Sequence, residues 1–113
     1  MYHVISRGVG RGKIFLTNDD YSKFLEYVAS AGEKFNLDIF AFVLMSNHYH
    51  ILFRTNEANL SRAMQWIQTA YSVHYNRNHK RSGHLFQARY KSVLVEDESY
   101  WYILSLSIHF DSI

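Results

Sequence analysis

Two extended segments in the middle of the chain, joined by only two residues, constrain the fold more than any other feature. Residues 38–45 are almost all apolar, as expected of a central strand that is covered on both faces. The next run alternates apolar and basic side chains. On a strand, one face would carry Tyr49, Ile51 and Phe53, and the opposite face would carry His48, His50 and Arg54. The connection through Ser46 and Asn47 is short enough to require an antiparallel hairpin.

The segments on either side supply further strands and helices. Residues 2–8 alternate as a strand and lead into a glycine-rich basic loop. Asn18 can cap a helix that continues to about Lys34, because two aspartates follow it in the first turn. A second helix is expected to begin at Asn59 or at residues 55–56. Its buried stripe would consist of Leu60, Met64, Ile67, Tyr71 and His74 or Tyr75.

A strand over about residues 89–95 and a last helix toward Ile113 complete the order of elements. Asp97 or Ser99 can cap this last helix. The order strand, helix, strand, strand, helix, strand, helix predicts an α+β fold: a ferredoxin-like split βαβ antiparallel sheet with an additional C-terminal helix. A chain of 113 residues is expected to form one domain, residues 1–113.

The composition excludes several classes of protein. A hydrophobic content of 48% is too high for a disordered segment. Cysteine is absent, which excludes a disulfide framework and a thiolate nucleophile. No apolar run is long enough to span a membrane, and the first residues lack the pattern of an export signal. We therefore expect a cytoplasmic protein without a membrane partner.

The pair His48 and His50 is the strongest candidate for chemistry. Residues two apart on a strand point the same way, so both imidazoles would converge on one metal ion or one phosphate. The alternative is two strand histidines without a ligand, since seven histidines in 113 residues make such a pair expected by chance. Four further histidines show no evident partner and are interpreted as structural: His3, His74, His79 and His109.

Basic residues gather in two places although the net charge is only +2. The first group is Arg7, Arg11 and Lys13, and the second is Arg77, Lys80, Arg81, His84, Arg89 and Lys91. Such clusters, with Tyr90 among the second, fit the phosphate backbone and the unpaired bases of a single strand. The alternative is a solvated edge whose apolar neighbours Leu85, Phe86 and Tyr90 belong to the core.

Several ordered blocks of residues resemble one protein family over residues 2–111. The blocks are Tyr2-His3-Val4 with Arg7-Gly8, Ile14-Phe15, Val43 to His50, Gly83 to Ser92, Val95 to Asp97, and Ile108-His109. In these blocks the chain resembles the single-tyrosine HUH transposases, in particular the branch that includes the REP-associated tyrosine transposases.

The resemblance implies an enzyme that cleaves and rejoins single-stranded or hairpin DNA during transposition. Two histidines, here His48 and His50, would hold a divalent cation, Mg or Mn, on the scissile phosphate. A tyrosine on the last helix would attack phosphorus and form a phosphotyrosine. An oxygen ligand one helical turn later would complete the cation site, and Asp111 stands at that position. The apolar last helix is expected to be covered by another element or a second subunit, and insertion-sequence members of the family form homodimers.

The nucleophile departs from the family pattern. Ser107 occupies the position of the tyrosine, and Tyr100 is the nearest tyrosine on the same face of the expected helix. Ser46 replaces a proline before Asn47. These differences leave two other functions open. One is a degenerate or domesticated module that binds nucleic acid without cutting it, and the other is a metal-dependent phosphodiesterase that uses a bound hydroxide.

Overall fold

The computed structural model describes residues 1–55, 58–87 and 89–95. The expected last helix lies outside these residues, together with the predictions that concern Tyr100, Ser107 and Asp111. The elements follow the order β1 (Tyr2–Arg7), η1 (Val9–Arg11), α1 (Asn18–Lys34), β2 (Leu37–Met45), β3 (His48–Thr55), α2 (Leu60–Asn78) and β4 (Lys91–Leu94). This is the predicted α+β order over the described part of the chain.

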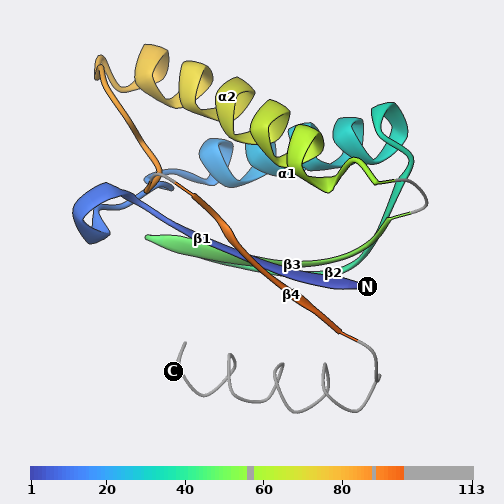
Figure 1. The fold of residues 1–113 in the computed structure, drawn as a ribbon. Coiled ribbons are helices and arrows are strands. Elements are labelled where there is room, and N and C mark those ends of the chain that lie inside the picture. The colour runs from blue at the N-terminus through green and yellow to red at the C-terminus, as the bar shows by residue number, and fades with distance from the viewer. Residues whose placement is uncertain (56–57, 88, 96–113) are drawn as a thin grey trace.

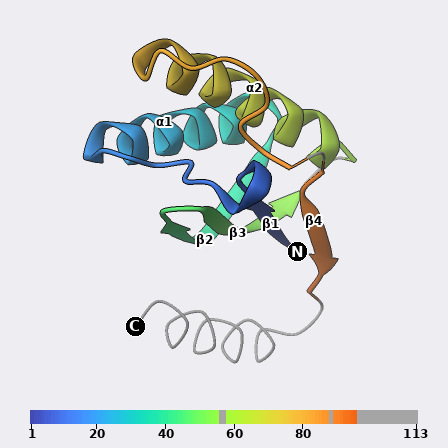
Figure 2. The same ribbon diagram turned by 90° about the vertical axis from the view of Figure 1, so that its left-hand side faces the viewer.

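The four strands form one antiparallel sheet in the order β2-β3-β1-β4. Figures 1 and 2 show that α1 and α2 lie side by side on the same face of this sheet. The arrangement is that of a split βαβ fold, as the sequence predicts. The predicted hairpin is also confirmed, because β2 and β3 pair directly across the turn of Ser46 and Asn47.

The position of β2 differs from the sequence prediction. Its apolar run suggests a central strand, but among the described residues β2 lies at one end of the sheet. Phe40 and Phe42 are 49% and 48% exposed. The pairing with β3 also shifts register between Ile39 and Ala41. Continuous apolar sequence is therefore not enough to place a strand inside a sheet.

The core lies between the sheet and the two helices. The side of β3 that faces the helices contributes Tyr49, Ile51 and Phe53, all with no exposed surface. Of the predicted stripe of α2, Met64, Ile67, Tyr71 and Tyr75 are buried and Leu60 is partly buried, and Ala63 is buried as well. Aromatic rings make many of the contacts, and Phe24 of α1 lies 4.8 Å from Tyr49 and 5.3 Å from Tyr71 between ring centroids. This packing fixes which face of β3 points away from the helices.

The first helix begins one residue earlier than a cap at Asn18 would require. Thr17 is the N-cap, and it forms a capping box with Asp20 in which each side chain accepts from the other residue's backbone N–H. The second helix begins after Asn59, one of the two predicted positions. Asn59 supplies no side-chain cap, and its Nδ2 donates to the carbonyl of Phe35.

Candidate functional site

The strand β3 places His48 and His50 on the face of the sheet that points away from the helices. Their ring centroids are 5.2 Å apart, as the alternation of a strand predicts. On the neighbouring strand β1, His50 stands opposite Ile5, and His48 stands opposite Arg7. An exposed guanidinium therefore lies beside the histidine pair.

A third histidine joins the pair. His3 of β1 lies with its Nε2 3.0 Å from Nδ1 of His50, and the two rings stack with centroids 5.2 Å apart. This contact of His3 has no signature in the sequence, because the two residues are 47 positions apart and meet through the pairing of β1 with β3. The alternation of residues 2–8 predicts on which face of its strand His3 lies. It does not predict which residues of the neighbouring strand pair with it.

Hydrogen bonds orient both imidazoles of the pair. Nδ1 of His48 is 2.8 Å from Oδ1 of Asn47, and Nδ1 of His50 is held by His3. With Nδ1 of each ring engaged in this way, Nε2 is the nitrogen that each ring would offer to a cation. Partners of this kind fix the tautomer and direction of metal-binding histidines.

The surroundings also keep His50 neutral. Burial is the main cause that lowers the pKa of His50 to about 4, and the nearby His3, His48 and Arg7 lower this pKa further. Burial likewise lowers the pKa of His3. A neutral imidazole has a lone pair to donate, so His50 is in the ligand form at neutral pH.

The residues present fit part of a divalent-cation site. Two oriented imidazoles are suitable ligands, but hard cations such as Mg and Mn require oxygen ligands as well. Within residues 1–55, 58–87 and 89–95, no group of three His, Cys, Asp or Glu side chains is placed to hold a metal ion. The oxygen ligand expected from the sequence, Asp111, lies outside these residues.

A basic pocket opens at the end of β3 that carries His48. It has a volume of about 280 Å³ and is lined by Arg7, Arg11, Asn47 and His48. Arg11 reaches this position from the 3-10 turn η1, which it ends with a left-handed φ of 61°. The chain turns tightly here, and a Cβ on Gly8 would lie 2.0 Å from the carbonyl oxygen of Gly12. Glycine at position 8 is thus required for the pocket to form.

Backbone contacts fasten the glycine-rich loop to the β2–β3 turn. The N–H groups of Ile14 and Phe15 donate to the carbonyl of Ser46 at 2.7 and 3.1 Å. The N–H of Gly8 donates to the carbonyl of Asn47 at 3.0 Å. These bonds tie the residue that orients His48 to the loop that carries Arg11.

Two tyrosines of α2, four positions apart, hold the same glycine-rich loop from the helix side. The hydroxyls of Tyr71 and Tyr75 donate to the carbonyls of Ile14 and Lys13 at 2.5 and 3.4 Å. One turn later, Nε2 of His79 lies 2.8 Å from Oδ2 of the buried Asp20. His79 is therefore structural, as predicted, but it has a specific partner.

Asp20 is the polar centre of this attachment. Its carboxylate accepts from the N–H groups of Leu16 and Thr17 at 2.9 and 3.2 Å and interacts with His79. Burial by itself would raise the pKa of Asp20. The hydrogen bonds from Leu16, His79 and Thr17 outweigh burial, and the pKa lies below its ordinary value. The carboxylate stays charged and holds the end of the loop.

The second basic segment runs beside the first. The N–H of Val9 donates to the carbonyl of Leu85, and the N–H of Gln87 donates to the carbonyl of Arg7, both at 2.9 Å. Leu85 and Phe86 are buried, so the apolar residues of this segment do belong to the core. This pairing brings the neighbourhood of His84 close to Arg7.

The cations of the second cluster do not converge on one point. Arg81 is held by Asn76 Oδ1 at 3.0 Å and by the carbonyl of His84 at 2.9 Å. Arg77 lies in the last turn of α2 and Lys80 just beyond it, and Lys91 stands opposite Ile5 on β4. Arg89 lines a different pocket, on the helix side of the sheet. Of the predicted basic residues, only Arg7 and Arg11 line the pocket of His48 in the described part of the chain.

Comparison with known proteins identifies the family. The family described as "Transposase IS200 like" matches residues 1–105, and the chain belongs to this family. No curated protein sequence matches the chain. The family match therefore places the chain in the class of the transposases, the proteins of DNA transposition.

Two solved structures share the fold. One is a candidate transposase from Deinococcus radiodurans, with a TM-score of 0.67 and 15% identity, covering 96% of this chain and 88% of that one. The other is a REP-associated tyrosine transposase bound to a REP hairpin, with a TM-score of 0.69 and 13% identity. That match covers 89% of this chain, which spans 59% of the hairpin-bound protein. None of the helices that the structure describes is long and apolar enough to cross a membrane.

Proposed function

We propose that this chain binds single-stranded or hairpin DNA at the pocket of Arg7, Arg11, Asn47 and His48, and holds a divalent cation there through His48 and His50. The single observation that supports the proposal most strongly is the placement of two oriented imidazoles beside two arginines. The solved relative that was captured with a REP hairpin supports DNA as the partner.

The proposed roles follow from the chemistry of each side chain. Arg7 and Arg11 bind phosphate oxygens of the strand, because guanidinium groups match phosphate geometry. His48 and His50 ligate the cation, Mg or Mn, and Asn47 orients His48. When bound, a divalent cation supplies charge that stabilises negative charge developing on the scissile phosphate. Asp111 is proposed as the oxygen ligand.

Strand cleavage depends on the nucleophile. In the active form of the proposal, the hydroxyl oxygen of Ser107 or Tyr100 loses its proton and bonds to phosphorus as the P–O3′ bond breaks. This step leaves a 5′ phosphoester on the protein and a 3′ oxygen that takes up a proton. Attack of that 3′ hydroxyl on the phosphoester later rejoins a strand and releases the side chain. The second candidate is a module that binds DNA without cutting it. It is favoured by Ser107, because a serine hydroxyl stands where the family has a tyrosine.

Binding of a labelled DNA hairpin in the presence and absence of Mn tests the proposal. The double variant His48→Ala and His50→Ala is expected to lose the Mn-dependent part of the affinity, about tenfold or more. His74→Ala removes a histidine on α2, away from the pair, and is expected to bind like the unmodified protein. Absence of binding to every structured single strand would contradict the proposal.

The same reactions distinguish cleavage from binding alone. A covalent protein–DNA adduct that disappears in Ser107→Ala or Tyr100→Phe would identify the nucleophile. Binding without any adduct or strand break would favour the non-cutting module. Release of a free 5′ phosphate without an adduct would instead indicate hydrolysis by a metal-bound hydroxide.

A further inference from the structure

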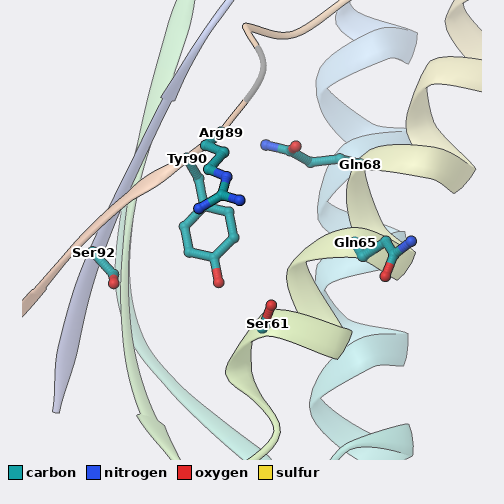
Figure 3. A pocket seen from close by; sticks show the side chains of 6 residues that line it. All are labelled: Ser61, Gln65, Gln68, Arg89, Tyr90 and Ser92. Atoms are coloured by element: carbon teal, nitrogen blue, oxygen red, sulfur yellow. The ribbon is translucent and has the colours of Figure 1, made fainter.

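A second pocket lies on the opposite side of the sheet from the histidine pair. It occupies about 650 Å³ between α2 and the segment that enters β4, and Figure 3 shows its lining: Ser61, Gln65, Gln68, Arg89, Tyr90 and Ser92. The three residues from α2 are four and three positions apart and therefore share one face of the helix. Every lining side chain carries a hydrogen-bonding group, which indicates a polar ligand.

Gln68 is fixed in this pocket by two hydroxyl groups. Its Nε2 donates to the Tyr49 hydroxyl at 2.7 Å and to Ser6 Oγ at 2.8 Å. Tyr49 has no exposed surface, so its hydroxyl is a rigid partner. Both amide protons of Gln68 are used in these bonds, and Oε1 is the polar atom that this amide offers to a ligand.

Tyr90 and Arg89 add an aromatic ring and a positive charge to the lining of the same pocket. The ring of Tyr90 is partly buried and packs against the core, and Arg89 lines the same pocket (Figure 3). Aromatic rings stack on unpaired bases, arginine binds phosphate, and an amide oxygen accepts from base N–H groups. A volume in the range of about 300–1,000 Å³ is typical of small-molecule sites.

We infer that the pocket between α2 and β4 binds one unpaired nucleotide. Its base would stack on Tyr90 and donate to Oε1 of Gln68, and its phosphate would bind Arg89. A lining with one cation and one aromatic ring fits a single nucleotide better than a polyphosphate or a long duplex contact. Where the nucleotide is part of the bound DNA strand, the inference rests on the proposed function. A free mononucleotide presents the same base and phosphate groups to the pocket.

The contact with Tyr49 joins this pocket to the histidine pair. Tyr49 stands between His48 and His50 in β3, and its side chain passes to the helix side, where Gln68 holds it. The two sites thus lie on opposite faces of the same three residues. Among the described strands β4 lies at one end of the sheet, and Arg89 and Tyr90 directly precede it, so a DNA strand could reach both sites around this end.

Two labelled hairpins distinguish this pocket from the rest of the DNA site: a blunt hairpin, and the same hairpin with a four-nucleotide single-stranded extension. We expect the unmodified protein to bind the extended form about tenfold more tightly, given the usual strength of stacking on an aromatic ring. Arg89→Ala should remove this advantage, so that the two hairpins bind with equal affinity. Arg62→Ala removes the same charge from α2 without altering the lining and should keep the advantage.

Tyr90 and free mononucleotides provide a second measurement. Tyr90→Phe should retain the advantage of the extended hairpin and Tyr90→Ala should lose it, with thermal melting as the check on folding. If Tyr90→Ala does not fold, the Arg89 and Arg62 variants still decide. A deoxynucleoside monophosphate that competes with the extended hairpin and not with the blunt one would place a free nucleotide in the same pocket.

The outcomes separate the two proposals. Equal affinity of the unmodified protein for both hairpins would overturn the nucleotide pocket and leave the proposed function standing. An advantage that survives Arg89→Ala, or that Arg62→Ala also abolishes, would overturn the pocket as well. If no hairpin binds at all, the proposed function fails. The pocket then survives only if a free mononucleotide binds and Arg89→Ala abolishes that binding.

Discussion

The two faces of β3 have different surroundings although their residues alternate along one short segment. Tyr49, Ile51 and Phe53 point toward α1 and α2 and have no exposed surface. His48 and His50 point away from the helices and are held by side-chain hydrogen bonds. One strand can therefore carry residues that stabilise the fold on one face and residues that bind ligands on the other. Substitutions on one face should unfold the protein, and those on the other should alter its binding.

The largest expected effect is on the helix side. Phe53→Ala removes a fully buried ring and should lower the free energy of unfolding by about 3–5 kcal/mol. Chemical denaturation measures this loss, with His48→Ala as the matched substitution on the other face. A loss of the same size in His48→Ala would show that the two faces are not separate in function.

A smaller effect is expected at the residue that orients His48. Asn47→Ala removes the Oδ1 acceptor and should weaken Mn binding about 10- to 100-fold, the usual cost of losing such a partner. Titration calorimetry with Mn measures the affinity. Asn47→Asp keeps an acceptor oxygen and should restore most of it, whereas failure of this rescue would point to a different role for Asn47.

Asp20 tests the attachment of the loop on the helix side. Asp20→Asn weakens its bonds to Leu16, Thr17 and His79, and should lower the free energy of unfolding by about 2 kcal/mol at neutral pH. Because the folded-state pKa of Asp20 lies below 3.8, its ionised form stabilises the fold above that pH, and this contribution is lost as the pH falls further. Denaturation at a series of pH values should show the variant and the unmodified protein converging in acid. A constant difference would argue against the charge.

The smallest effect is expected on the face of the histidines. Arg54 pairs with Asp38 at 2.9 Å and lies 5.2 Å from the ring centroid of Phe40, with about half of each charged side chain exposed. Arg54→Ala should cost less than about 1 kcal/mol, because exposed ion pairs are weak. The loss should shrink further in high salt. If Arg54→Ala lowered the free energy of unfolding more than Asp20→Asn does, this result would contradict the expected difference between the two faces of β3.

Local patterns predicted much of this fold from the sequence. The alternation after Asn47 predicted both faces of β3, and the spacing of apolar residues predicted α1 to its last residue, Lys34. The short connection predicted the hairpin of β2 and β3. Each of these features depends on neighbours within a few positions, so the sequence alone contains the information.

Contacts between distant segments could not be predicted in the same way. His3 meets His50 across 47 residues, and His79 meets Asp20 across 59. The first contact depends on strand register, and the second on how the two helices pack, and neither has a local signature. The apolar run of β2 was misleading for the same reason, because residue type does not reveal how many strands flank a segment.

The register shift in β2 has a consequence for the behaviour of the protein in concentrated solution. A straight strand at the end of a sheet, with exposed rings such as Phe40 and Phe42, offers its backbone as a template for another chain. The extra residue between Ile39 and Ala41 bends the strand and breaks the regular spacing of its donors and acceptors. The irregularity therefore opposes edge-to-edge aggregation along the most apolar strand of the molecule.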